Sequence, residues 1–302
     1  MKQSPQPKSQ FRKLSLISLV ALGVAAGPIS LAQETEAGVA EEAVSAALEV
    51  SFTNDPEARG TTPEAQKGYD ISARSDRTDT GFGDSKVSAR MVLRNAAGQE
   101  TERELSFSTL EKTDETVGDK SLVIFESPRD VEGTALLSHA KILDPDNQWL
   151  FLPALKRVKR ISSANKSGAF VGSEFAFEDF TVTELNKFTY SYIGEEELDG
   201  MTVDVIERFP RYEKSGYTKQ KSWVDQDIFQ ARKVEFYDRR GALLKTLTLS
   251  DYKNYNGVWR AQKFSMVNHQ SGKETDLLYE DYSFKNGLSE KDFNQGVLSR
   301  LR

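Results

Sequence analysis

The sequence contains no cysteine and only two histidines. Without cysteine the chain has no disulfide bond, no metal–thiolate site and no thiol nucleophile, so its stability must come from burial of apolar side chains. His139 and His269 belong to no cluster with metal-ligand spacing, and no G-x-S-x-G sequence marks a serine nucleophile. We expect no metal, no cofactor and no enzyme activity. A Ser–His–Asp arrangement assembled in space stays open as a distant alternative.

Long apolar runs are also scarce. The clearest one, residues 14–26, follows four basic residues and precedes the small-residue pattern Ser30-Leu31-Ala32. This order predicts a secretory signal peptide over residues 1–32 that is cleaved after Ala32. The run is shorter than the roughly 20 apolar residues of a membrane span, and an uncleaved anchor is the alternative. We therefore expect the mature protein in the periplasm.

Positive charge is in deficit. The chain has 40 Lys and Arg against 46 Asp and Glu, and removing the four basic residues of the signal peptide leaves 36 against 46, a net charge of −10. A nucleic-acid-binding protein needs a dominant basic face, so this class is not expected. The charged fraction of 28% beside a hydrophobic fraction of 38% fits a sheet with one face exposed to water.

The rest of the chain divides into a leader and one domain. Residues 33–62 are acidic and rich in alanine, and they predict either a weak helix or a flexible leader. Thr62-Pro63-Glu64 has the N-cap, first-turn proline and acidic residue of a helix start, and this helix is expected to end near Arg74. No long polar linker interrupts residues 63–302, which predicts a single domain.

Apolar residues alternate with polar ones from Ser85 onward, with Val87, Ala89, Met91 and Leu93 on one face, as in a half-buried strand. Regularly spaced turn residues between 187 and 284 predict a meander of antiparallel strands. Ser289 is expected to cap a short C-terminal helix. The predicted strands are 85–94, 102–110, 122–125, 133–143, 148–152, 188–193, 201–207, 218–224, 232–237, 243–249, 259–267 and 275–284.

Residues 144–180 stand out within this pattern. A basic cluster there places four cations in five positions of an otherwise acidic chain: Lys156, Arg157, Lys159 and Arg160. One interpretation is an edge strand or turn that uses charge to prevent association between sheet edges. The other is a docking site for anionic lipid headgroups or an acidic membrane partner, and the local excess of one sign favours it slightly.

Large aromatic side chains surround the basic cluster. They are candidates for the wall of an apolar ligand cavity, because such walls are rich in aromatic residues, but they would equally suit a solid core. The six candidates are Trp149, Phe151, Phe170, Phe175, Phe177 and Phe180.

The sequence WLFLPALKRVKRISS, followed by GSEFAFEDF, resembles the signature of the periplasmic outer-membrane lipoprotein-sorting proteins, the LolA-like group of the LolA/LolB superfamily. The resemblance covers about residues 65–300. It implies a mainly β (α+β) fold, an open antiparallel β-barrel with short helices at or in the mouth. Phe175, Phe177 and the basic cluster belong to this signature.

The resemblance also implies a function. A protein of this group would take up a lipid or an acylated lipoprotein in its apolar cavity, receive it from an inner-membrane transporter or other membrane partner, and pass it towards the outer membrane. The alternative on the same fold is a periplasmic sensor or regulatory module similar to RseB/MucB, which binds a partner protein and carries no cargo.

Overall fold

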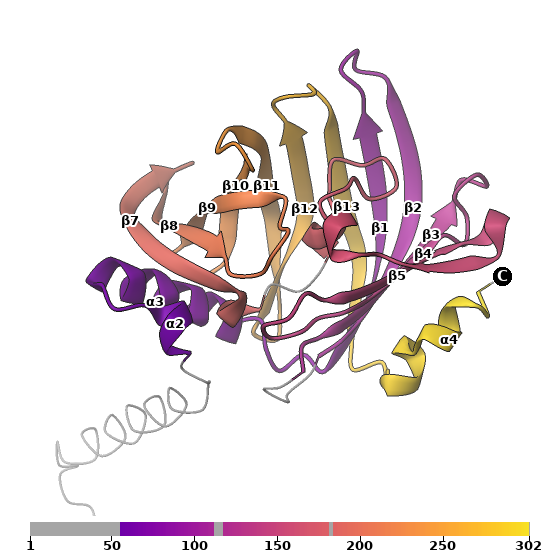
Figure 1. The fold of residues 1–302 in the computed structure, drawn as a ribbon, viewed down its shortest axis with the longest axis horizontal. Helices are drawn as coiled ribbons and strands as arrows, with labels where there is room; N and C mark the ends of the chain where they lie inside the picture. The colour runs from indigo at the N-terminus through magenta and orange to yellow at the C-terminus, as the bar shows by residue number, and fades with distance from the viewer. Residues whose placement is uncertain (1–54, 112–116, 181–183, 302) are drawn as a thin grey trace, which may run out of the picture. The chain divides into compact units, whose positions relative to one another are not determined.

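The computed structural model describes residues 55–111, 117–180 and 184–301. These residues form 13 antiparallel strands in one sheet, with the order β6-β5-β4-β3-β2-β1-β13-β12-β11-β10-β9-β8-β7 (Figure 1). The strands are β1 (Asp84–Arg94), β2 (Glu100–Leu110), β3 (Lys120–Ser127), β4 (Ala135–His139), β5 (Asn147–Leu152), β6 (Arg157–Arg160), β7 (Phe188–Leu198), β8 (Met201–Pro210), β9 (Tyr217–Asp225), β10 (Ala231–Asp238), β11 (Leu243–Tyr255), β12 (Val258–Asn268) and β13 (Glu274–Phe284).

The two edges of the sheet are β6 and β7, which do not pair with each other. The sheet is therefore open, and the predicted open antiparallel architecture is confirmed. Each predicted strand of the meander lies within an observed one. β11 runs to Tyr255, beyond the predicted end at Leu249, because its polar end pairs with the start of β12 across the turn at Asn256-Gly257. Apolar alternation marks the buried part of a strand, whereas backbone pairing continues past it.

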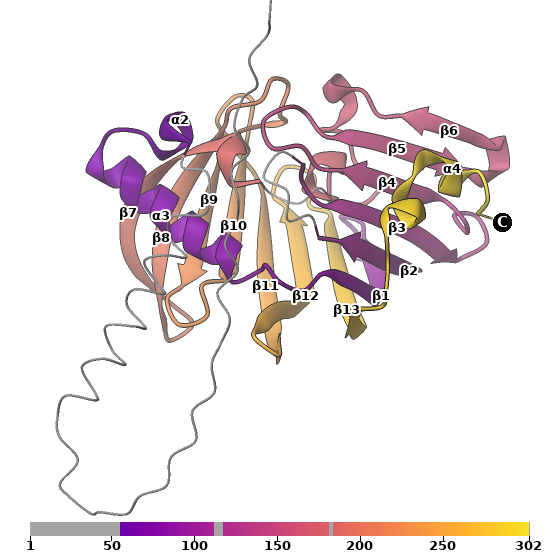
Figure 2. The same cartoon turned by 90° about the horizontal axis from the view of Figure 1, so that it is seen from below.

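The predicted helix start is also confirmed. Helix α3 (Pro63–Arg77) has Thr62 as its N-cap, with the Thr62 hydroxyl accepting a hydrogen bond from the amide of Ala65, and it runs one turn past Arg74. It packs along β7 (Figure 2). Gly68 permits this approach, because a Cβ at this position would lie 3.0 Å from the backbone of Ser191.

A second short helix, α2 (Pro56–Arg59), precedes α3 and packs on β7, so residues 55–62 of the predicted leader include an ordered element. Residues Thr53–Arg302 form one compact unit. The predicted signal peptide, 1–32, and the first part of the leader, 33–54, lie outside the described residues. None of the described helices combines the length and apolar content that crossing a bilayer requires.

Two apolar clusters lie on opposite faces of the sheet because successive strand residues alternate. On the inner face the cluster includes Met91, Phe125, Leu136, Met266 and Leu277. The segment between β6 and β7 folds over this face (Figure 1).

The outer face of β3–β5 is covered by the C-terminal segment. This segment contains the one-turn helix η5 (Glu290–Phe293), which Ser289 caps as predicted, and helix α4 (Gln295–Leu298). Phe293 and Leu298 are fully buried there. The remaining one-turn helices are η1 (Pro153–Leu155), η2 (Ser163–Asn165), η3 (Phe177–Phe180) and η4 (Leu185–Lys187).

Candidate functional site

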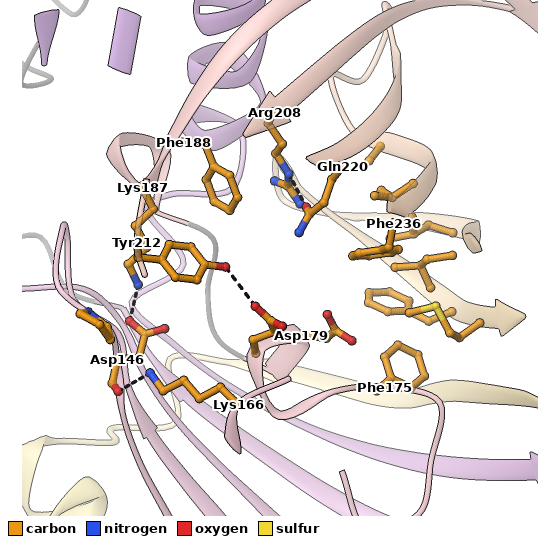
Figure 3. A pocket seen from close by; sticks show the side chains of 18 residues that line it. Asp146, Lys166, Phe175, Asp179, Lys187, Phe188, Arg208, Tyr212, Gln220 and Phe236 are labelled. Atoms are coloured by element: carbon orange, nitrogen blue, oxygen red, sulfur yellow. Dashed lines mark hydrogen bonds and ion pairs between the residues drawn. The ribbon is translucent and has the colours of Figure 1, made fainter. Parts of the chain in front are cut away.

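The inner face holds a cavity of about 230 Å³, which we call the main pocket, between β8–β12 and the segment that folds over them (Figure 3). One wall is apolar and comes mainly from β10, β11 and β12: Ala231, Val234, Phe236, Leu247, Leu249, Phe264 and Met266, with Phe175 facing them. The other end is polar: Asp146, Lys166, Glu178, Asp179, Lys187, Arg208, Tyr212 and Gln220. The main pocket is thus amphipathic.

Strand register builds the apolar wall. Val234 on β10 lies opposite Leu247 on β11, and Leu247 lies opposite Met266 on β12. Because directly opposed residues point to the same face, the three side chains form one continuous row across three strands. We call Val234, Leu247 and Met266 the apolar row.

A second row crosses β8, β9 and β10 and starts with polar residues. Arg208 on β8 lies opposite Gln220 on β9, which in turn lies opposite Phe236 on β10. The Nε of Arg208 donates a hydrogen bond to Oε1 of Gln220 at 2.6 Å, and its guanidinium lies 4.9 Å from the centre of the Phe188 ring. Arg208 and Gln220 therefore lie on strands β8 and β9 of the same sheet, next to the strands β10–β12 that form the apolar wall.

Asp146 organises a second part of the polar end. Its carboxylate forms an ion pair with Lys187, and its backbone carbonyl accepts a hydrogen bond from Nζ of Lys166. All three residues are buried. Burial lowers the pKa of the Lys166 ammonium, which Asp146 only partly opposes.

Two adjacent carboxylates from the overlying segment complete the polar end. Asp179 forms an ion pair with the buried Lys245 at 2.6 Å and accepts a hydrogen bond from the Tyr217 hydroxyl at 2.8 Å. Glu178 accepts hydrogen bonds from the amide of Gly216 at 2.8 Å and from the Tyr212 hydroxyl at 3.3 Å. Burial, followed by repulsion from Asp179, raises the pKa of Glu178.

A second pocket, of about 300 Å³, lies beside the main pocket and includes Phe107, Phe180 and Tyr279 in its wall. Leu249 and Phe264 line both pockets. These two side chains therefore form part of a shared wall.

The four predicted phenylalanines of the overlying segment lie together on the inner face. Phe170 is fully buried, with ring centres 5.5 Å from Phe125 and 4.4 Å from Phe180. Phe177 packs edge-on against Phe170, with ring centres 5.6 Å apart. Phe175 lines the main pocket and Phe180 the second, whereas neither pocket wall includes Phe170 or Phe177.

Trp149 and Phe151 differ from these four. They lie on the outer face of β5 and pack in the cluster with Phe293 and Leu298 of the C-terminal segment. For these two candidates the cavity interpretation is corrected in favour of the core alternative, because the C-terminal segment fills the space beside them. A sequence that is bulky on both faces of a strand does not show which face meets a ligand.

The basic cluster lies at one edge of the sheet. Arg157, Lys159 and Arg160 belong to the edge strand β6, and Lys156 precedes it; all four are exposed. The cluster contributes nothing to the wall of the main pocket.

The two histidines have structural partners. Nε2 of His139 lies 2.7 Å from the carbonyl oxygen of Phe293, and Nε2 of His269 lies 2.8 Å from the Thr246 hydroxyl. In the part of the chain that the structure describes, no three His, Asp or Glu side chains gather as a metal site.

The polar end of the main pocket was missed by sequence reasoning. Its residues come from four separated parts of the chain, and no motif links Asp146 and Lys166 to Arg208 or Gln220. The only available signal is weak: Arg208 falls on the side of its strand shared with the buried Ile206.

Comparison with known proteins gives a family match. A family model described as "-like: Uncharacterized protein" matches residues 118–300. The solved structure of a domain described as an outer membrane lipoprotein-sorting protein, from Vibrio parahaemolyticus, is 49% identical, with a TM-score of 0.76, covering 78% of this chain and 100% of that one. A DUF1329 family protein from Desulfovibrio piger is 28% identical with a TM-score of 0.75, over the same shares of both chains.

A third structure, of a LolA superfamily protein from Nitrosomonas europaea, has 23% identity and a TM-score of 0.62, again over 78% of this chain and 100% of that one, and shows the shared fold alone. Among curated proteins no match was found.

Proposed function

Because the chain belongs to the LolA-like outer-membrane lipoprotein-sorting proteins, we propose that it is a periplasmic carrier that binds the acyl chain of a lipid or acylated lipoprotein in the main pocket and passes it towards the outer membrane. One observation carries this proposal. The apolar row lies in the same pocket as a charged and hydrogen-bonding end, and an amphiphile presents the same two parts.

The energetics suit a reversible carrier. Each methylene group of an acyl chain gains about 0.8 kcal/mol when it leaves water, so a carrier competes with a membrane only if it covers most of the chain. The main pocket and the second pocket lie side by side on the inner face, and together they offer more apolar wall than either alone. Transfer would follow differences in affinity between donor, carrier and acceptor, with no catalytic step.

A fluorescent fatty acid such as cis-parinaric acid tests the proposal. Wild-type protein freed of lipid should bind it saturably, and Leu247→Trp, which places a larger side chain in the apolar row, should lower the affinity at least tenfold. Leu198→Trp is the matched control, because Leu198 packs near Val203 on the outer face, away from the pocket. The proposal would be refuted if the wild type bound no fatty acid, or if both variants lost the same affinity for it.

The sensor alternative requires a different experiment. Protein isolated from its own periplasm and measured by native mass spectrometry should carry lipid if it is a carrier. A stoichiometric protein partner without lipid would favour the sensor. The proposed export is tested on the same sample, since the mature chain should begin at Gln33.

A further inference from the structure

Two cations around the main pocket pair with carboxylates, Lys187 with Asp146 and Lys245 with Asp179. Lys166 and Arg208 have no carboxylate in ion-pair contact among the described residues: Lys166 donates to the backbone carbonyl of Asp146, and Arg208 to the side chain of Gln220. The Nε of Arg208 is satisfied by Gln220, but the described part of the chain supplies no acceptor for Nη1 or Nη2. Figure 3 shows its guanidinium directed into the pocket beside Gln220.

The acidic groups of the pocket are already engaged. Asp146 holds Lys187, and Asp179 holds Lys245 and the Tyr217 hydroxyl. Glu178 accepts hydrogen bonds from Gly216, Ser215 and Tyr212. Each of these carboxylates therefore has partners of its own, and Arg208 keeps no carboxylate in ion-pair contact among the described residues.

An uncompensated cation is costly inside a protein. Arg208 is half-buried; burial lowers the pKa of its guanidinium and Tyr190, Tyr212 and Asp179 oppose this, yet a guanidinium remains charged at any physiological pH. A half-buried cation without a carboxylate partner favours an anion that enters the pocket and pairs with it. Two free guanidinium nitrogens match the two oxygens of a carboxylate, or two oxygens of a phosphate.

We propose that the ligand of the main pocket is an anionic single-chain amphiphile, whose chain lies on the apolar row and whose carboxylate or phosphate accepts hydrogen bonds from Nη1 and Nη2 of Arg208. This inference rests on the proposed carrier function and adds the charge of the ligand. The volume of the pocket, about 230 Å³, lies below the 300–1,000 Å³ typical of small-molecule pockets and so favours a ligand with one chain over a ligand with two or three.

Three probes separate the parts of this proposal: palmitate, its uncharged methyl ester, and a lysophosphatidic acid with the same chain. Wild-type protein should bind palmitate or the lysophosphatidic acid at least tenfold more tightly than methyl palmitate, and the tighter of the two anions identifies the headgroup. Arg208→Met should remove this preference and leave methyl palmitate affinity within about twofold. Arg208→Lys, which keeps the charge but not the paired nitrogens, should restore part of it.

Arg211→Met is the matched control, because Arg211 is three residues away and pairs with Asp55 and Glu57 outside the pocket. It should leave all three affinities unchanged. Thermal unfolding supplies a second measurement: Arg208→Met should raise the unfolding temperature of the lipid-free protein, since it removes a half-buried cation that has no carboxylate in ion-pair contact, whereas Arg211→Met breaks two ion pairs and should lower it.

The possible failures are distinguishable. Equal wild-type affinity for palmitate and methyl palmitate would overturn the anionic ligand and leave the carrier function standing. If Arg208→Met lowers the affinity for all three probes equally and also lowers the unfolding temperature, Arg208 has a structural role, and the proposal of an anionic ligand is overturned as well. No binding of any probe by the wild type would overturn the carrier function itself.

Discussion

Leu249 on β11 lies directly opposite Phe264 on β12, and these two side chains line the main pocket and the second pocket at once. They come from the part of the sheet where the two pockets meet, and both are only partly buried. In the proposed carrier, this pair would therefore set the length of acyl chain that the two pockets can cover.

Removing one member of the pair should join the pockets. We expect Phe264→Ala to shift binding preference from palmitate towards a longer fatty acid such as arachidate by several-fold, because the added space continues the apolar wall. Competition with a fluorescent fatty acid measures the shift. Phe151→Ala, on the outer face, is the control and should leave the preference unchanged. A preference that does not move in Phe264→Ala would mean that the pockets are independent.

The aromatic residues of the inner face should differ in their contributions to stability. Phe170→Ala should lower the free energy of unfolding by about 3–5 kcal/mol, as for a close-packed core phenylalanine, because Phe170 is fully buried among other rings. Phe175→Ala should lower the free energy of unfolding clearly less than Phe170→Ala, because one side of Phe175 faces the main pocket. It should also change the affinity for a fatty acid. Urea unfolding and probe titration on the same samples check both. Equal costs without any change in affinity would make Phe175 an ordinary core residue.

The basic cluster should act in docking and contribute little to folding. Replacing Lys156, Arg157, Lys159 and Arg160 by Gln should weaken binding to vesicles containing anionic lipid and flatten its salt dependence, because each basic residue near such a surface contributes about 1 kcal/mol. The unfolding midpoint should change little, since exposed charges stabilise weakly.

A control with the same loss of charge replaces four other exposed basic residues: Arg239, Arg240, Lys253 and Lys273. It should retain vesicle binding. If the two variants bind alike, the basic cluster only protects the sheet edge from association.

Stability should depend on pH through Asp76 in the last turn of α3. Burial, and then repulsion from Asp79 and Asp119, raises the pKa of Asp76 from its usual 3.8 to about 6. Between these values the folded protein binds more protons than the unfolded chain, so the free energy of unfolding falls as pH rises from about 4 to about 6. Asp76→Asn should remove this part of the slope in urea unfolding series, whereas Glu64→Gln, exposed on the same helix, should retain it. An unchanged slope in Asp76→Asn would assign the pH dependence to other groups.

The sequence predicts the elements of this fold better than its site. In strands with one solvent-exposed face, such as β1, apolar and polar residues alternate with a period of two. Turn pairs such as Asn256-Gly257 mark where the chain reverses. The aromatic strand β5 could not be oriented in this way, because Trp149 and Leu150 are both bulky although they point to opposite faces. The site depends on contacts such as that of Arg208 with Gln220, which exist only because β8 and β9 pair in one register.

The pairing of β1 with β13 has a consequence for biogenesis. Met91 lies beside Leu277, so the first strand of the sheet finds one of its two neighbours only when the last strand is present. During synthesis, until β13 has been made, β1 has one unpaired edge and its inner-face side chains lack the cover of β13. Folding that depends on such distant contacts is slow, and it leaves strand edges open to association meanwhile. A chain that stops before β13 would keep this edge permanently, and it would be a substrate for chaperones and proteases.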